Sequence, residues 1–150
     1  MITTEEIKAL REQTGLSIMQ CKAALEEAGG DKEKAIALLK AKGAEIASKK
    51  GDRTLGAGTV VSYIHSGDTV GVLLELHSET DFVAKNPEFK AVAKEIAMHI
   101  AAMKPETTEE LLQQPFIKDP SKTIADIING TVQKFGERTE VGRFTRYSIN

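Results

Sequence analysis

The chain has 150 residues and a formal net charge of −2, with 41% hydrophobic and 28% charged residues. These values exclude a disordered or fibrous chain, and the near-neutral charge argues against direct binding of nucleic acid. Cys21 is the only cysteine, which excludes an internal disulfide and a cysteine-based zinc site and fits a reducing compartment.

The amino terminus and the apolar runs give no sign of membrane insertion. Residues 1–8 lack the basic and apolar regions of a secretory signal peptide. The longest apolar stretch, residues 70–74, is far shorter than the ~20 residues that span a bilayer. We therefore expect a soluble, cytoplasmic protein with no membrane partner.

The first part of the chain shows the pattern of three short helices. Thr3 with Glu6 and Ser17 with Gln20 are capping-box pairs that open the first two helices. Asp31 is placed to cap the third. Glycines lie where the three helices are expected to end: Gly15, Gly29, Gly30 and Gly43.

Three helices of this length make a core near the lower limit for independent stability. A basic, glycine-rich stretch, residues 48–58, follows them and indicates a boundary. We predict a three-helix module over residues 1–50 and an α+β core over residues 51–150.

The pattern then changes to the alternation typical of strands. Runs of β-branched and apolar residues on either side of residues 66–68 (Ser-Gly-Asp) predict a β-hairpin. With a two-residue loop at positions 67 and 68, Val61 pairs with Leu74 and Tyr63 with Val72. One face of the hairpin is then apolar and has to be covered.

A long helix from Asn86-Pro87 to about Met103 carries a continuous apolar stripe and is predicted to cover this face. A short helix should open at Thr107 and stop before Pro115.

A last helix is predicted from Asp119-Pro120 to Gly136, because apolar residues keep helical spacing through Asn129-Gly130. Residues 141–149 should add a third strand to the hairpin. The predicted core is therefore a three-stranded antiparallel sheet packed by helices.

A catalytic site is the first hypothesis to test. Glu75, His77 and Glu79 are close in sequence, but alternating polar residues are expected on the exposed face of an antiparallel strand. His65 and His77 lie at opposite ends of the hairpin, and His99 should pack against polar neighbours, so the three histidines do not form a metal site. The sequence predicts no catalytic residue, no metal site and no cofactor.

Two places are better explained as binding surfaces. Met19 follows Ile18 directly, and adjacent helical residues point about 100° apart, so one small core cannot bury both; an ordinary surface methionine is an equal alternative. Thr80, Asp81, Phe82 and Val83 lie in the connection after the second strand. By composition Phe82 is expected to pack beneath the following helix, and less often to project as an aromatic that inserts into a partner.

At both places the chain resembles the elongation factor Ts family. Residues 10–25 (Leu-Arg-Glu-Gln-Thr-Gly-Leu-Ser-Ile-Met-Gln-Cys-Lys-Ala-Ala-Leu) are similar to its amino-terminal signature, and residues 79–86 (Glu-Thr-Asp-Phe-Val-Ala-Lys-Asn) to its second signature. Residues 136–138 and 143–147 resemble its closing strand. The resemblance implies a ubiquitin-associated-like (UBA-like) three-helix module, a single dimerisation-type core repeat, and a guanine-nucleotide exchange factor for elongation factor Tu.

The resemblance also reverses the expectation for Phe82. It implies that the segment Thr80–Val83 docks on the GTPase domain of elongation factor Tu, where the aromatic ring disturbs the Mg²⁺ and phosphate site and GDP is released. It implies that Met19 contacts another helix of that domain. Many relatives carry a helical insertion that this chain lacks between Met103 and Pro115, and the single core suggests that two chains pair as a homodimer.

Rival functions stay open at this point. A UBA-type adaptor that binds polypeptides accounts for the three-helix module but leaves the segment Thr80–Val83 unexplained. An enzyme needs a titrating pair, for which Glu75 and His77 are the candidates. A relative that has kept the fold and lost exchange activity is a third alternative.

Overall fold

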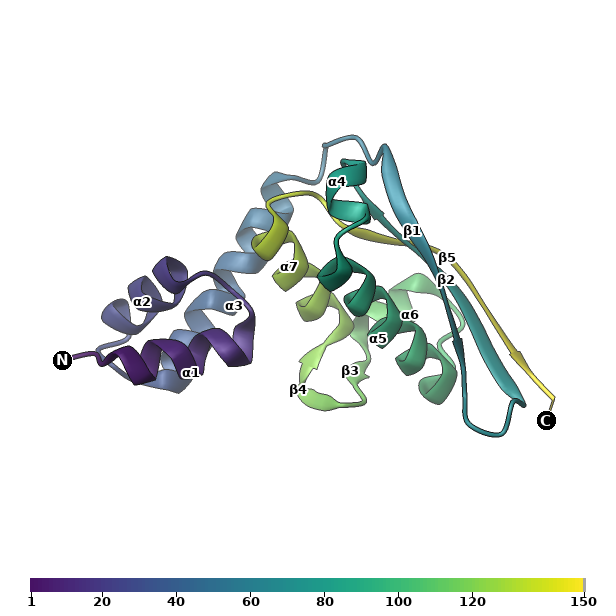
Figure 1. Ribbon diagram of the computed structural model, residues 1–150, viewed down its shortest axis with the longest axis horizontal. Coiled ribbons are helices and arrows are strands. Elements are labelled where there is room, and N and C mark those ends of the chain that lie inside the picture. Colours follow the sequence, from purple (N-terminus) through teal and green to yellow (C-terminus); the bar gives the residue numbers. More distant parts are fainter. Residues whose placement is uncertain (150) are drawn as a thin grey trace.

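The structure of the protein is a computed structural model that describes residues 1–149; Asn150, the last residue of the predicted core, lies outside them. The chain has a three-helix end and a broader half in which helices lie on one face of a sheet, with the third helix running between the two (Figure 1).

Three helices form the amino-terminal end: α1 (Thr4–Thr14), α2 (Ile18–Glu27) and α3 (Lys32–Lys49). Both predicted capping boxes, on Thr3 and on Ser17, are present, and Asp31 caps α3. Gly15 follows α1 in the left-handed region, with φ 71°. A small buried cluster joins the three helices: Leu10, Leu16, Cys21, Ala24, Leu25, Ala35 and Leu39.

The prediction that Gly43 ends the third helix is wrong, because α3 continues through it to Lys49. Gly43 is buried where α3 crosses a later helix. A Cβ atom at this position would lie 2.8 Å from Oε1 of Gln133 and 3.4 Å from the carbonyl oxygen of Asn129. The glycine therefore permits a close approach of two helices and does not terminate one.

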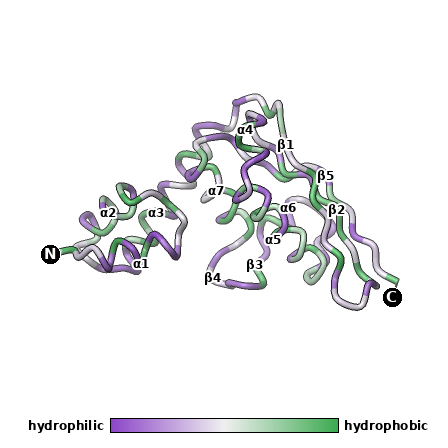
Figure 2. The backbone as a smooth tube through the Cα atoms, in the orientation of Figure 1, coloured by the Kyte–Doolittle hydropathy of each residue, from purple (hydrophilic) through white to green (hydrophobic). Residues whose placement is uncertain are grey.

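The main sheet is antiparallel with strand order β1-β2-β5. Its strands are β1 (Ala57–Ile64), β2 (Val70–Ser78) and β5 (Glu140–Ser148). Val61 pairs with Leu74 and Tyr63 with Val72, so the predicted hairpin register is confirmed. Hydrophobic segments run along these strands (Figure 2).

Helices cover the inner face of this sheet. The single turn α4 (Asp81–Ala84) and the long α5 (Pro87–Met103) pack directly on the strands, and the short α6 (Thr108–Gln113) and α7 (Ile124–Phe135) complete this side, where α7 packs on α5 and α6 on α7. The predicted start of α5 at Asn86-Pro87 and the predicted stop of α7 at Gly136 are confirmed.

The prediction that the last helix begins at Asp119-Pro120 is wrong. Residues Asp119–Thr123 form the short strand β4, which pairs with β3 (Pro115–Phe116). The carboxylate of Asp119 accepts hydrogen bonds from the backbone and the hydroxyl of Ser121 and so supports a turn. Thr123 and Asp126 form the capping box that actually opens α7.

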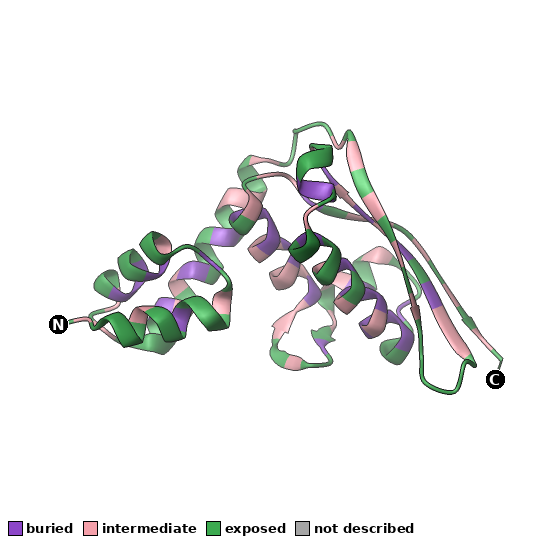
Figure 3. Ribbon diagram, viewed as in Figure 1, coloured by how far each residue is buried: buried purple, intermediate pink, exposed green. Residues whose placement is uncertain are grey.

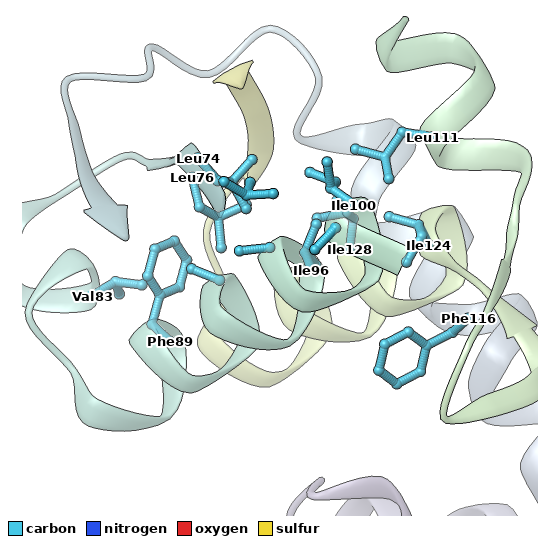
Figure 4. Close-up of a cluster of buried hydrophobic side chains, with 14 residues drawn as sticks. Leu74, Leu76, Val83, Phe89, Ile96, Ile100, Leu111, Phe116, Ile124 and Ile128 are labelled. Atoms are coloured by element: carbon cyan, nitrogen blue, oxygen red, sulfur yellow. The ribbon is translucent and has the colours of Figure 1, made fainter. Parts of the chain in front are cut away.

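The main hydrophobic core lies between the sheet and helices α5 and α7. Leu74, Leu76, Phe89, Ile96 and Ile100 are fully buried there, and Figure 4 shows them together with the residues from α6 and α7 that complete the cluster. Buried residues lie on the inner sides of α5 and α7 (Figure 3). The observed fold is the predicted α+β class.

Candidate functional site

The segment Thr80–Val83 lies where the chain leaves the sheet. β2 ends at Ser78, whose hydroxyl donates a hydrogen bond to the carbonyl of Thr80 at 3.0 Å. The side-chain oxygen of Thr80 accepts a hydrogen bond from the backbone N–H of Val83 at 3.4 Å and caps α4. The segment is thus an ordered, capped turn, which we call the Phe82 turn (Glu79–Ala84).

The side chains of the Phe82 turn point in different directions. Val83 is 5% exposed and packs in the core, where Figure 4 shows it beside Phe89, whereas Phe82 is 86% exposed. The expectation from composition, that Phe82 packs beneath the helix, is therefore wrong. Because burying a large apolar side chain contributes about 1.5–3 kcal/mol, an aromatic ring held in solvent on an ordered turn is a candidate partner contact.

Asp81 is also exposed and begins the turn α4. Its carboxylate makes no hydrogen bond or ion pair with any other residue in the range 1–149. It therefore has no evident part in shaping the turn and is open to a partner.

A carboxylate from a distant part of the chain holds the Phe82 turn. Glu137, which follows the left-handed Gly136 at the end of α7, accepts hydrogen bonds from the N–H of Glu79 at 3.1 Å, the N–H of Thr80 at 3.0 Å and the hydroxyl of Thr80 at 2.7 Å. In return the carboxylate of Glu79 accepts a hydrogen bond from the N–H of Arg138 at 2.5 Å. The two chain segments are joined reciprocally.

The sequence alone does not indicate a role for Glu137. Its partners lie 57 and 58 residues away, and no local pattern links such distant positions. The only signal was that residues 136–138 resemble part of a family's closing segment.

The second candidate contact lies on α2. Ile18 is 53% exposed and Met19 is 82% exposed, on the first turn of the helix, while Cys21 is buried. The expectation that one small core cannot bury both Ile18 and Met19 is confirmed, since it buries neither. α2 and the Phe82 turn lie on different parts of the molecule, with α3 between them (Figure 1).

The residues considered for acid–base chemistry form a surface ion pair. Glu75 accepts hydrogen bonds from the guanidinium of Arg143 at 2.6 and 3.0 Å and from its backbone N–H at 2.8 Å. These bonds lower the pKa of Glu75 to about 2. His77 lies 3.4 Å from the same carboxylate. Glu79, the third residue considered, is engaged with Arg138 and Arg53.

The three histidines lie in three different environments. His65 is exposed and hydrogen-bonded to the hydroxyl of Tyr63. His99 is fully buried, as expected among polar partners: its Nδ1 accepts from the N–H of Ile117, and its Nε2 lies 2.9 Å from Oε1 of Gln114. Burial lowers the pKa of His99, which keeps its imidazole neutral. No group of three potential ligands suited to a metal ion occurs within residues 1–149.

Fold and site together define a class of protein. An α+β protein with exposed apolar side chains on ordered helical turns has the features of a factor that acts by binding another protein. No helix among the described residues combines the length and the apolar character needed to cross a bilayer.

Comparison with known proteins identifies the family. The family model described as "Elongation factor TS" matches residues 8–110 and 79–150. Elongation factor Ts of Desulforamulus reducens is 40% identical, over 99% of this chain and 89% of the relative. Elongation factor Ts of Carboxydothermus hydrogenoformans is 39% identical, over 99% of this chain and 89% of the relative. Elongation factor Ts of Thermodesulfovibrio yellowstonii is 40% identical, over 99% of this chain and 96% of the relative.

The chain therefore belongs to the elongation factor Ts family, and its role is that of a translation elongation factor. The alignment with the Desulforamulus relative runs over 193 positions, whereas this chain has 150 residues. The relative thus holds residues that have no counterpart here.

Proposed function

We propose that this chain is a guanine-nucleotide exchange factor that binds elongation factor Tu in the cytoplasm and promotes the release of GDP. The observation that carries the proposal is the 86% exposure of Phe82 on a turn whose neighbouring residues, Val83 and Ala84, are buried. An aromatic side chain presented in this way is suited to enter a partner's surface as a hot spot.

The residues of the Phe82 turn have distinct proposed roles. Phe82 enters the GTPase domain as a wedge and disturbs the Mg²⁺ and phosphate site. Asp81 contacts the partner at the edge of this wedge, because its carboxylate is exposed and unengaged. Thr80 shapes the turn through its hydrogen bonds, and Val83 anchors it in the core.

Met19 is proposed as the second contact, made by the amino-terminal helices. We propose that residues 1–50 act as a UBA-like module and residues 51–150 as a single core repeat. The two buried clusters, one in α1–α3 and one between the sheet and α5–α7, support this division. The long α3, which packs on α7, would hold the module at a set place relative to the Phe82 turn.

The mechanism needs no catalytic group in this chain. GTPases hold nucleotide through Mg²⁺ and phosphate contacts, so a shift of either weakens binding. The coupling is reciprocal: a factor that loosens GDP is loosened by GDP in the same ratio. A thousandfold effect corresponds to about 4 kcal/mol of coupling.

We also propose that two copies of the chain pair through the outer face of the sheet. This face bears exposed apolar side chains from all three strands: Val60 and Ile64 on β1, Leu73 on β2 and Tyr147 on β5. A second copy offers the same surface, as a two-fold interface requires. The molar mass of the wild type from sedimentation equilibrium should be twice the chain mass of 16.3 kDa. The molar mass of Leu73→Arg should equal that of one chain.

The test is the release of fluorescent GDP from elongation factor Tu, measured by stopped flow over a range of factor concentrations. The wild type should accelerate release strongly. Phe82→Ala should lower the saturating rate by at least about thirtyfold, as expected for a hot spot of 2 kcal/mol or more. Ile117→Ala, which removes an exposed apolar side chain on the β3–β4 connection, is the control and should behave like the wild type.

No acceleration by folded wild-type protein would refute the exchange proposal. Ile18 and Met19, both exposed on the three-helix end, would then favour the adaptor that binds polypeptides. Equal rates for Phe82→Ala and the wild type would leave exchange standing but refute the role of Phe82.

A further inference from the structure

We infer that Glu137 is a positioning residue for nucleotide exchange, which holds the Phe82 turn in its projecting conformation through Thr80. This inference rests on the proposed exchange function and names a residue outside the segment Thr80–Val83. It starts from the geometry of one carboxylate, which accepts three hydrogen bonds from Glu79 and Thr80.

The hydroxyl of Thr80 connects Glu137 to the turn. Its hydrogen is donated to Oε2 of Glu137 at 2.7 Å, so a lone pair of the same oxygen is free to accept the N–H of Val83 at 3.4 Å. The cap of α4 is therefore oriented by Glu137. Since α4 is a single turn of four residues, it has little helical stability of its own and depends on this cap and on the burial of Val83.

The conformation that Glu137 supports is one that hydrophobic burial opposes. Phe82 would gain free energy by folding onto apolar surface, but rotation of α4 would break the hydrogen bonds of Thr80. Both oxygens of Glu137 are used: Oε1 accepts two backbone N–H groups and Oε2 accepts the hydroxyl. The carboxylate thus acts through the turn and has no need to touch the partner.

The position of Glu137 in the chain gives the turn a second support. Glu137 directly follows Gly136, the C-cap of α7, and α7 packs against α3. The Phe82 turn is therefore held from α7 as well as from its own strand, β2. When the partner pushes on Phe82, this support would resist displacement of the turn, so that the partner's site is deformed instead.

The first experiment compares Glu137→Ala with Glu140→Ala in the GDP-release assay. Glu140→Ala is the matched control, because it removes a carboxylate three residues away that accepts hydrogen bonds from the guanidinium of Arg138 and not from Thr80. Glu137→Ala should lower the saturating release rate at least about tenfold, the effect of losing charged hydrogen bonds, and Glu140→Ala should stay within about twofold of the wild type. The backbone amides of Glu79 and Thr80 should exchange hydrogen faster in Glu137→Ala than in the wild type, and at the wild-type rate in Glu140→Ala.

The second experiment separates positioning from a general structural role. If Glu137 acts through Phe82, then Glu137→Ala should have no further effect on release in the Phe82→Ala background, because the two changes remove one interaction. Thr80→Ser keeps the hydroxyl and should retain the wild-type rate, while Thr80→Val removes it and should reproduce Glu137→Ala. The Thr80 pair also tests the inference should Glu137→Ala fail to fold.

The outcomes are distinguishable. A wild type that does not accelerate release refutes the proposed function. An active wild type with Glu137→Ala and Thr80→Val equally active refutes the inference and leaves the function intact. If Glu137→Ala lowers the release rate by the same factor in the Phe82→Ala background as in the wild type, the inference is also refuted, since Glu137 would then act independently of Phe82.

Discussion

The two exposed apolar side chains, Phe82 and Met19, are held in different ways. Phe82 stands on a turn fastened by a buried neighbour, Val83, and by the carboxylate of Glu137 from a distant segment. Met19 stands on the first turn of a regular helix, fixed locally by the capping box of Ser17. The first contact depends on tertiary structure and the second on the integrity of a small module.

The two regions also differ in the size of their cores. The sheet and its helices bury a cluster that includes Phe89, Ile96 and Ile100, whereas the largest buried members of the three-helix cluster are four leucines. Small cores leave little reserve of stability. We therefore expect the Met19 surface to be lost by local unfolding more readily than the Phe82 turn, which the following predictions test.

The largest effect is expected from Leu10→Ala in the three-helix module. Leu10 is fully buried, so its truncation should cost about 2–5 kcal/mol. Amide hydrogen exchange should then show loss of protection in α1 and α2, while β2 and α5 stay protected. Equal loss of protection in both regions would show that the module and the core unfold as one unit.

The next effect concerns the contact between α3 and α7. Gly43→Val places side-chain atoms against Gln133 and Asn129 and should lower the free energy of unfolding by about 1–3 kcal/mol, measured by urea denaturation. Gly130→Ala is the matched control, since a Cβ there meets nothing within 4 Å, and it should stabilise α7 by about 0.5–1 kcal/mol. A neutral Gly43→Val would show that Gln133 and the contact between the two helices adjust at no cost.

Met19→Ala should have a smaller effect, on binding alone. The half-saturating concentration in the GDP-release assay should rise roughly fivefold, as for an interface residue worth about 1 kcal/mol, with the saturating rate unchanged. Phe82→Ala should instead lower the saturating rate. If Met19→Ala and Phe82→Ala both change the half-saturating concentration, or both change the saturating rate, then the proposed difference between a binding contact at Met19 and a wedge at Phe82 is wrong.

The smallest effect is expected at Glu75, on the outer face of the sheet and apart from both contacts. Its pKa is lowered from 4.5 to about 2 by Arg143, so the folded state binds fewer protons than the unfolded state between these pH values. The pair's contribution is therefore present above about pH 4.5 and is lost as the pH falls toward 2, and it is small because the pair lies at the surface of the single chain. Carboxyl NMR titration should show the low pKa, and Arg143→Gln should raise it; a wild-type pKa near 4.5 would contradict the ion pair.

Much of the fold could be predicted because its signals are local. Thr3 and Ser17 open helices with residues three positions away, and the loop at residues 66–68 sets the hairpin register. Each signal involves a hydrogen bond or a backbone angle within a few residues. For the same reason Asp119-Pro120 misled the prediction, since Pro120 fits a strand edge as well as a first helical turn.

The site could be predicted only in part. Resemblance identified the segment Thr80–Val83 and Met19 as candidates, but composition favoured a buried Phe82. Which of two adjacent apolar residues enters the core depends on the direction in which the turn leaves the sheet, and that direction has no signature in the local sequence.

The sequence by itself determined the helix starts, the strand pairing and the apolar stripe of α5, because these depend on short-range geometry and periodicity. Only the tertiary structure decided that Gly43 lies inside a helix, since its role is to admit Gln133 of another helix. Likewise, only the folded chain brings Glu137 to Thr80, across 57 residues, and so leaves Phe82 in solvent. Long-range contacts of this kind arise from the packing of whole elements, and no local pattern records them.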